Sequence, residues 1–371
     1  MKKLIFRKFL LDTTNFFLLS LISLSIIVWV MQAVNFLDFI TEDGHGIKVY
    51  LYYTLLNLPK IISRILPTIF FISLFYMIIK YESNNELIIY WTNGIKKNQF
   101  MHNIVIFSIF FLLIQIILTS LVVPTSQNAA RSHIRSSNID FFPSLIKERQ
   151  FIDVVDKLTI FIDERKANGE LKNIFLKEET SDRKENQIVI AKKGNLITED
   201  FKSYLILYDG VFIKKQNKKI TNFEFNKTKF DLTKFATKTT THPKIQELST
   251  NQLIRCIKSF MEDPEHDNKK DIFCKKSTVK YSKQELYKRL FTPFYIPVIS
   301  LIACFLILRN KDDYNYNFFK IFIFITAIIV IIISEISTRY SSQSDELTII
   351  LLILPFLIFF NNYFIFLKRK T

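Results

Sequence analysis

Three basic side chains, Lys60, Arg64 and Arg131, lie near prolines at the ends of long apolar runs. Lys60 directly follows Pro59, and Arg131 follows the apolar run that ends at Pro124. Guanidinium and ammonium groups are suited to phosphate, arginine by its bidentate fork. The chemistry they predict is the binding of an anionic lipid head group. Snorkelling of long side chains at a helix end is the alternative, and it explains Lys60 more easily than Arg64.

A second chemical feature is a carboxylate at the start of a short segment, SNNELIIYWTNGIKK at 83–97. Ser83 and Glu86 have the S-x-x-E spacing of a capping box, and Gly94 is suited to end a helix. We therefore expect a short helix at 84–93. The middle of this helix is too apolar to be left in water. It consists of Leu87, Ile88, Tyr90 and Trp91.

Catalytic and cofactor motifs are missing from the sequence. It contains neither a G-x-x-x-x-G-K-[ST] phosphate loop nor an HExxH zinc motif, and its five histidines are scattered. The acidic run at 262–267 fits a solvated loop better than a cation site. Cys256 and Cys274 could pair or both be free. We expect no catalytic residues, no metal, no cofactor and no enzyme activity.

The elements that carry these residues are membrane spans. The chain has 371 residues, of which 49% are hydrophobic, and a net charge of +16. A bilayer core needs about 20 apolar residues in a helix. Six segments satisfy this requirement: 11–31, 61–80, 101–123, 291–308, 318–337 and 347–366.

Lysine and arginine in the short loops predict the orientation of these spans. The segments on the side of the N-terminus hold Lys2, Lys3, Arg7, Lys8, Lys80, Lys96, Lys97, Arg309, Lys311, Lys320, Lys368, Arg369 and Lys370. The short loops on the other side hold Lys48 and Arg339. Because basic loops stay inside, both termini are expected in the cytoplasm and residues 124–285 outside. With the positive charge divided between two compartments, nucleic acid is not an expected partner.

The external insert is expected to be β-rich over residues 148–235. Alternating apolar runs predict at least six strands, with hairpin turns at Asn168-Gly169 and Asp209-Gly210. Residues 243–290 then change to helical patterns, and the last helix is expected to continue into the fourth span. The predicted domains are therefore 1–123, with three spans, 124–285, with the β domain and a helical connector, and 286–371, with three more spans.

This arrangement resembles the LptF/LptG permeases, which export lipopolysaccharide from the bacterial inner membrane. The segments that carry the resemblance are NLPKIISRILP ending at Pro67, ESNNELIIYWTNGI at 82–95, VVPTSQNAARS at 122–132, FIDVVDKLTIFIDERKANGELKNIFL at 151–176 and QELYKRLFTPF at 284–294. The phrases in the β region are more similar to LptF than to LptG.

The resemblance implies an ATP-binding cassette exporter subunit without ATPase activity of its own. The helix at 84–93 would be a coupling helix that docks on a cytoplasmic, LptB-like ATPase dimer. Its family motif stands here as Asn85-Glu86-Leu87, with Asn where Ser is usual. The implied contacts are Glu86, Leu87, Ile88 and Trp91, and the implied head-group ligands are Lys60, Arg64 and Arg131.

The resemblance also implies a periplasmic β-jellyroll and several partners. They are a homologous LptG-like six-span subunit, a single-span LptC-like accessory protein, a periplasmic bridge protein and lipopolysaccharide. The place implied is the inner membrane of a Gram-negative bacterium. The alternatives from the residues alone are a membrane anchor whose β domain binds a partner without transport, and an intramembrane enzyme acting on lipid.

Overall fold

The structure, a computed structural model, describes residues 2–37, 47–145, 148–155, 158–166, 169–179, 185–199, 202–216, 219–232, 244–262, 274 and 276–368. The chain divides into two compact units. The helical unit comprises Met1–Met31, Leu56–Asn128 and His242–Thr371, and the sheet unit comprises Gln32–Leu55 and Ala129–Thr241.

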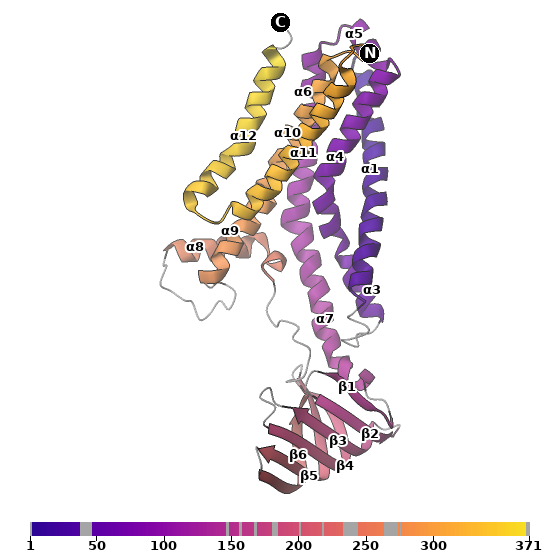
Figure 1. Ribbon diagram of the computed structural model, residues 1–371, viewed down its shortest axis with the longest axis vertical. Coiled ribbons are helices and arrows are strands. Elements are labelled where there is room, and N and C mark those ends of the chain that lie inside the picture. The colour runs from indigo at the N-terminus through magenta and orange to yellow at the C-terminus, as the bar shows by residue number, and fades with distance from the viewer. Residues whose placement is uncertain are drawn as a thin grey trace. The chain divides into compact units, whose positions relative to one another are not determined.

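The described chain contains six helices that are long and apolar enough to cross a membrane, which confirms the six predicted spans (Figure 1). They are Leu4–Asn35, Ile47–Ser83, Lys97–Ile134, Thr278–Leu308, Tyr316–Tyr340 and Glu346–Lys368. These runs are built from α1 (Lys2–Asn35), α3 (Ile47–Leu56), α4 (Leu58–Ser83), α6 (Lys97–Ile117), α7 (Val123–Leu145), α9 (Lys276–Leu290), α10 (Tyr295–Cys304), α11 (Tyr316–Tyr340) and α12 (Asp345–Lys368). The protein is a multi-pass membrane protein.

Proline marks two places where these spans change. The second span is interrupted at Asn57, between α3 and α4, and Pro59 lies in the first turn of α4, where its missing N–H costs nothing. The third span does not end at Pro124 as expected. It passes through one π-helical turn, Leu118–Val122, and continues as α7, because a proline near the start of a helix needs no intrahelical donor.

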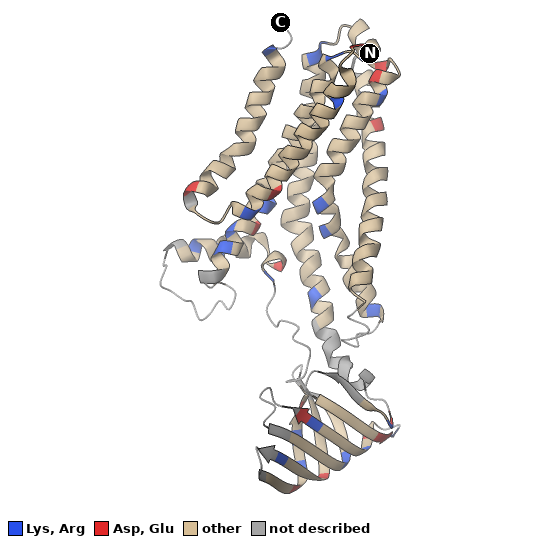
Figure 2. Ribbon diagram, viewed as in Figure 1, with Lys and Arg blue, Asp and Glu red and all other residues tan. Residues whose placement is uncertain are grey.

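The core of the helical unit is formed around α10, whose ten residues are all buried. Apolar side chains from α4, α6 and α11 pack on this helix, among them Phe71, Leu74, Ile104 and Ile323. The other spans turn many apolar residues outward, which suits helices whose solvent is lipid. In Figure 2 the basic residues of this unit lie at the end that carries the termini, on α4, and on the helices at 250–262 and 276–290.

The sheet unit contains one antiparallel sheet of six described strands in the order β1-β2-β3-β4-β5-β6. The strands are β1 (Phe151–Val155), β2 (Leu158–Arg165), β3 (Glu170–Glu179), β4 (Glu185–Glu199), β5 (Lys202–Gln216) and β6 (Lys219–Asp231). One face buries an apolar cluster that includes Leu158, Ile174, Val189 and Leu207. The predicted β domain is thus confirmed. Its described strands are neighbours in the sheet in the order in which they follow in the sequence, so the jellyroll likeness stays an expectation.

The two predicted hairpin turns have different outcomes. Gly169 adopts φ +84° between β2 and β3, where Gly169 N–H donates to Lys166 O, as a hairpin turn requires. The turn at Asp209-Gly210 is wrong, because β5 runs through both residues and keeps its register with β4 on either side. A Cβ on Gly210 would lie 2.3 Å from Ile190 O, so this glycine permits a close approach of strands.

The described residues between the sheet and the fourth span are mainly helical. They form a short 3₁₀ turn at Ile245–Glu247, then α8 (Thr250–Glu262) and α9 (Lys276–Leu290). After α9 the 3₁₀ turn Thr292–Phe294 joins α10 within one span. Most of the acidic loop expected at 262–267 falls outside the described residues.

Candidate functional site

The predicted short helix exists as α5, Glu86–Thr92, but it begins differently from the expected capping box. Ser83 is the last residue of α4, and its hydroxyl donates to Lys80 O. The residue before α5 is Asn85, with φ +61°. The capping box is therefore wrong, because the preceding helix already includes Ser83. Glu86 is left with a 3.2 Å hydrogen bond from Asn84 Nδ2.

The end of α5 agrees with the prediction. Gly94 has φ +70°, and its N–H donates to Trp91 O while Ile95 N–H donates to Tyr90 O. These two bonds form a Schellman motif, in which glycine takes the left-handed position. The helix is thus short and firmly closed at its C-terminal end.

One side of α5 packs into the core of the helical unit. Leu87 and Tyr90 are 1% and 2% exposed, and the Tyr90 ring contacts Phe6 and Phe100 with centroids 5.5 Å apart. The Tyr90 hydroxyl donates to Ile5 O of α1, and burial raises the pKa of this phenol. The expectation that Leu87 offers its side chain to a partner is therefore corrected, because this chain's own core covers it.

The opposite side of α5 is open. Ile88 and Ile89 are 53% and 50% exposed, and Glu86 and Trp91 are half-buried beside them. Lys97 lies with its Nζ 5.9 Å from the centre of the Trp91 ring. We call Glu86, Ile88, Ile89 and Trp91 the outward face of α5. Sequence reasoning missed Ile89, although its position next to Ile88 on a helix with one buried side could have indicated it.

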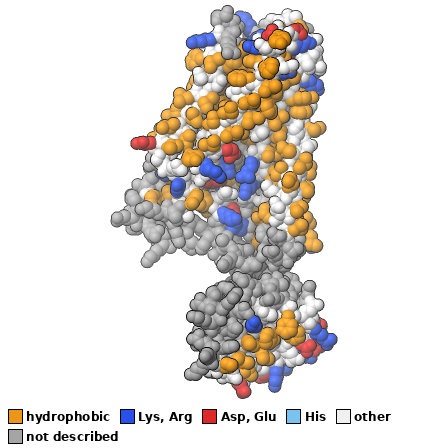
Figure 3. All heavy atoms as spheres, in the orientation of Figure 1, with side chains coloured by type: hydrophobic (Ala, Val, Ile, Leu, Met, Phe, Trp, Pro, Cys, Tyr) orange, Lys and Arg blue, Asp and Glu red, His pale blue; other side chains and the backbone are white. Residues whose placement is uncertain are grey.

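The second site is a polar cavity of about 70 Å³ within the helical unit. Lys60 and Arg64 line it from one turn of α4, and Lys288 and Arg289 line it from α9. Glu285 and Glu335 are the acidic residues of its lining. Figure 3 shows basic and acidic side chains gathered within an otherwise hydrophobic face of the bundle.

The lining of the cavity leaves an excess of positive charge. Arg289 Nε pairs with Glu285 Oε1 at 3.1 Å, and both side chains are largely buried. Lys60, Arg64 and Lys288 then face one acidic residue, Glu335. Lys60 Nζ donates to Gln127 Oε1 at 3.4 Å, and Gln127 is itself held by Asn57. A cavity of this kind favours an anion with several acceptor oxygens.

Arg289 connects the cavity with the connector. Its side chain is buried and donates to Leu248 O at 2.9 Å and to Gln246 O at 3.0 Å, in addition to Glu285. It also contacts Thr250 Oγ1, and this hydroxyl donates to Ser120 O of the π-helical turn. Sequence reasoning missed Arg289, although the i, i+4 spacing of Glu285 and Arg289 in QELYKRLF was a visible signal.

The third predicted basic residue, Arg131, is not part of the lining described for this cavity. It lies half-buried on the part of α7 that belongs to the sheet unit. The structure therefore brings Lys60 and Arg64 together in one cavity and leaves the role of Arg131 as an expectation.

The two cysteines left open by the sequence form a disulfide bond, Cys256–Cys274. It joins α8 to Cys274, two positions before α9 begins, and so it closes the connector on itself. The third cysteine, Cys304, is free and buried in α10.

Comparison with known proteins agrees with this arrangement. The model of one protein family, described as lipopolysaccharide export system permease LptF/LptG, matches residues 5–369 and does not separate LptF from LptG. The chain is also 25% identical over 196 residues to the uncharacterized protein RP871 of Rickettsia prowazekii (strain Madrid E). That match covers 52% of this chain and 53% of the relative, so the chain spans about half the length of the curated relative it matches. Because the family match extends over nearly the whole chain, the protein belongs to the LptF/LptG family of lipopolysaccharide export permeases.

Proposed function

We propose that this chain is a transmembrane permease subunit of an ATP-driven exporter that extracts lipopolysaccharide from the inner membrane. It would pair with a homologous LptG-like subunit, rest on a cytoplasmic LptB-like ATPase dimer and accept a single-span LptC-like helix. Its sheet unit would pass the lipid to a periplasmic bridge protein. ATP hydrolysis belongs to the separate ATPase subunit.

The observation that carries this proposal is the outward face of α5. Two isoleucines about half exposed to solvent, next to a carboxylate, form an amphipathic patch on a helix fixed to the core by Leu87 and Tyr90. Helix-in-groove recognition uses such a face, with apolar anchors and a charged residue that sets orientation. The patch suits the groove of a partner protein.

The polar cavity supports the lipid part of the proposal. Lys60, Arg64 and Lys288 present basic groups to a small cavity in a unit that is otherwise apolar. Phosphate groups of a lipid A-like head group would accept from these donors, and Arg64 is suited to bidentate contact. Arg131 is proposed as a further head-group ligand on the strength of the family resemblance.

The transport stroke requires two states with different contacts. Closure of the ATPase dimer would push α5. Because Tyr90 of α5 is hydrogen-bonded to Ile5 O of α1, this movement would be transmitted to the spans of the helical unit. The cavity would narrow and release the lipid. The Cys256–Cys274 disulfide supports a periplasmic location for the connector, because such bonds persist in oxidising compartments. Both termini would then be cytoplasmic.

The proposal is tested by purifying the detergent-solubilised complex through a tag on this chain and measuring the amount of bound ATPase. Glu86→Ala should reduce the bound ATPase about tenfold, if the carboxylate makes one desolvated charge-assisted contact. Asn84→Ala is the matched control, because it removes the hydrogen-bond partner of Glu86 and leaves the carboxylate in place.

Two results would contradict the proposal. If both variants reduce the ATPase equally, Glu86 acts by ordering its own loop. If the wild-type chain is recovered without an ATPase or a second six-span subunit, the proposed exporter function is wrong. The alternative function, a membrane anchor with a partner-binding β domain, would then be favoured.

A further inference from the structure

Two lysines connect the first three spans with the last three at the end of the helical unit that carries α5. Lys311, in the loop between α10 and α11, donates from Nζ to the carbonyl of Ser83, the last residue of α4, at 3.5 Å. Lys97, the first residue of α6, donates from Nζ to Leu308 O at 3.3 Å. Leu308 ends the 3₁₀ turn Phe305–Leu308, which continues α10. Each lysine thus binds the last carbonyl of a helix from the other half of the chain.

A carboxylate makes the same connection through the backbone. Glu82 Oε1, one residue before the end of α4, accepts from Lys311 N–H at 3.2 Å. The C-terminus of a helix carries a partial negative charge, and a lysine beside its last carbonyl is favourable there. The three contacts therefore join the end of α4 to the end of α10 from both sides. We call Glu82, Lys97 and Lys311 the clasp.

The loop that carries Lys311 is itself fixed to the helices it joins. Tyr316 N–H, at the start of α11, donates to Asp313 O at 2.9 Å. The Arg309 guanidinium lies 4.7 Å from the centre of the Phe319 ring of α11. A displacement of Lys311 would therefore move the neighbouring ends of α10 and α11.

The helix α10 connects the clasp with the polar cavity. It is buried along its whole length, and the turn Thr292–Phe294 joins its other end to α9. Lys288 and Arg289, near the end of α9, line the polar cavity. The clasp is equally near α5, which begins at Glu86, four positions after Glu82. One buried helix thus lies between the proposed ATPase contact and the proposed head-group site.

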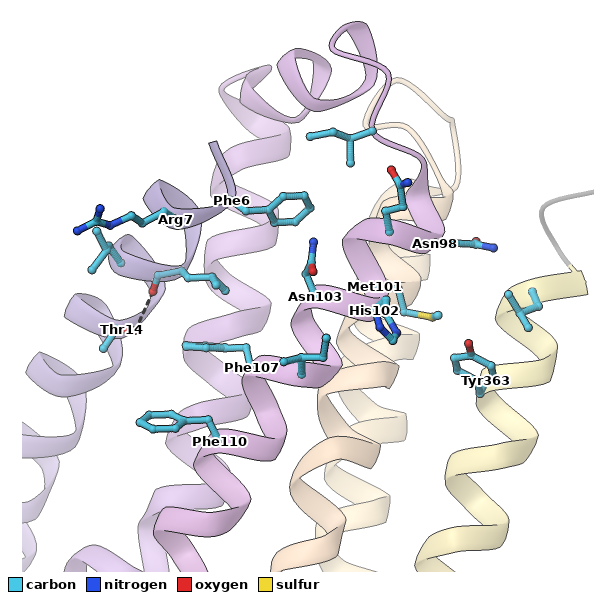
Figure 4. A pocket seen from close by; sticks show the side chains of 16 residues that line it. Phe6, Arg7, Thr14, Asn98, Met101, His102, Asn103, Phe107, Phe110 and Tyr363 are labelled. Atoms are coloured by element: carbon cyan, nitrogen blue, oxygen red, sulfur yellow. Dashed lines mark hydrogen bonds between the residues drawn. The ribbon is translucent and has the colours of Figure 1, made fainter. Parts of the chain in front are cut away.

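The start of α6 borders open space. A groove of about 1010 Å³ lies beside its first turns, and its lining includes Asn98 and His102 of α6 and Tyr363 of α12 (Figure 4). Close packing restrains a helix, and this side of α6 has less of it. The contact of Lys97 with Leu308 O therefore has a larger share in fixing the start of α6.

We propose that Glu82, Lys97 and Lys311 are positioning residues that transmit a displacement of α5 to α10, and through α10 to the polar cavity. The source of that displacement, closure of an ATPase dimer, rests on the proposed function. Without the clasp, α5 still binds the ATPase, but its movement passes to α1 through Tyr90 and not to α10.

The first test is hydrogen exchange, measured by mass spectrometry, of the purified full-length chain in detergent. No ATPase is present, so the result does not depend on the proposed function. The double variant Lys97→Met/Lys311→Met should speed amide exchange about fivefold in α5 and in residues 305–311, because hydrogen bonds from charged groups stabilise both segments. Each variant is first checked for a single peak in gel filtration.

Matched variants make this result specific. Lys80→Met/Lys96→Met removes the same charge from two exposed positions at the same end of the unit, outside the clasp, and should leave exchange unchanged. Lys97→Arg/Lys311→Arg retains a charged donor at each position and should exchange as slowly as wild type.

The second test separates transmission of movement from a merely structural role. The complex of this chain with its ATPase and second six-span subunit is reconstituted into proteoliposomes, and lipopolysaccharide release and ATP hydrolysis are both measured. Lys97→Met/Lys311→Met should bind as much ATPase as wild type and release about fivefold less lipid per ATP hydrolysed. The double arginine variant should restore the ratio.

Three results would overturn the proposal. They are unchanged exchange in α5, an unchanged amount of lipid released per ATP, and a loss of bound ATPase, which would mean that the clasp only folds the docking helix. A wild-type chain that binds no ATPase would instead contradict the proposed function, and the exchange experiment would still decide whether the clasp couples α5 to α10.

Discussion

At the scale of single residues, Arg289 is a buried cation that several hydrogen bonds hold in place. It is 1% exposed and donates to two backbone carbonyls of the connector and to one carboxylate. We expect Arg289→Met to lower the free energy of unfolding by about 3–5 kcal/mol, because the buried ion pair with Glu285 and the hydrogen bonds to Gln246 O and Leu248 O would all be lost. Unfolding in mixed detergent and denaturant measures this loss.

The neighbouring lysine gives the control for Arg289. Lys288 lies on the same turn of α9 and lines the same cavity, but the substitution Lys288→Met removes no buried ion pair. Its effect on unfolding should stay below about 1 kcal/mol. A loss as large as that of Arg289→Met would show that the charge of the cavity, rather than the Arg289 hydrogen bonds, stabilises the unit.

Residue patterns predicted the parts of the sites that depend on neighbours in the sequence. Lys60 and Arg64 are one turn apart on α4, so their meeting in one cavity followed from helical spacing. Arg289 and the carbonyls of Gln246 and Leu248 are separated by about forty positions, and only the tertiary fold brings them together. Leu87 was placed on a partner surface because its apolar type does not distinguish the chain's own core from another protein's groove.

At the scale of elements, the connector is held by the Cys256–Cys274 bond and by Arg289. Closing a loop of 18 residues should stabilise the folded connector by about 3 kcal/mol in the chain-entropy model. We therefore expect reduction, or the Cys256→Ser/Cys274→Ser double variant, to speed hydrogen exchange in α8 by about a hundredfold. Mass spectrometry of peptides from α8 measures the exchange.

Peptides from α10 provide the comparison for this experiment. Their exchange should not change, because Cys304 is buried and takes no part in the disulfide. Unchanged exchange in α8 after complete reduction would mean that the hydrogen bonds of Arg289 and Thr250 alone hold the connector.

Helices and strands were predictable to different degrees. Long apolar runs predicted all six spans, because a helix in lipid must satisfy its own backbone and stay apolar over its whole length. The turn at Asp209-Gly210 failed because the same dipeptide also serves where two strands approach closely. Glycine is needed at position 210 because Ile190 O of the neighbouring strand lies too close for a Cβ. The sequence around position 210 carries no information about this contact.

At the scale of the whole molecule, the orientation of the spans can be tested by introducing one free cysteine at a time, since Cys256 and Cys274 are joined in a disulfide. Tyr314, which is 98% exposed between α10 and α11, is expected in the cytoplasm, and Gln343, between α11 and α12, is expected outside. In a Cys304→Ala background, an impermeant maleimide applied to intact spheroplasts should label Gln343→Cys. Tyr314→Cys should be labelled only after the membrane is permeabilised.

The reverse labelling pattern would mean that the topology is inverted and that α5 lies on the periplasmic side of the membrane. The proposed contact of α5 with an ATPase would then be impossible. Labelling of both positions in intact spheroplasts would point to leaky cells, which a cytoplasmic marker enzyme reveals in the same sample.

The π-helical turn at Leu118–Val122 sets the rotational phase of the third span. Gln115 and Gln127 both line the polar cavity, although they are twelve positions apart. In a regular α-helix with 3.6 residues per turn, twelve positions rotate a side chain by about 120° from the starting direction. One inserted residue, which is what a π-bulge is, reduces this offset to about 20°. The inserted residue therefore turns the side chains of both halves of this long helix toward the same polar cavity.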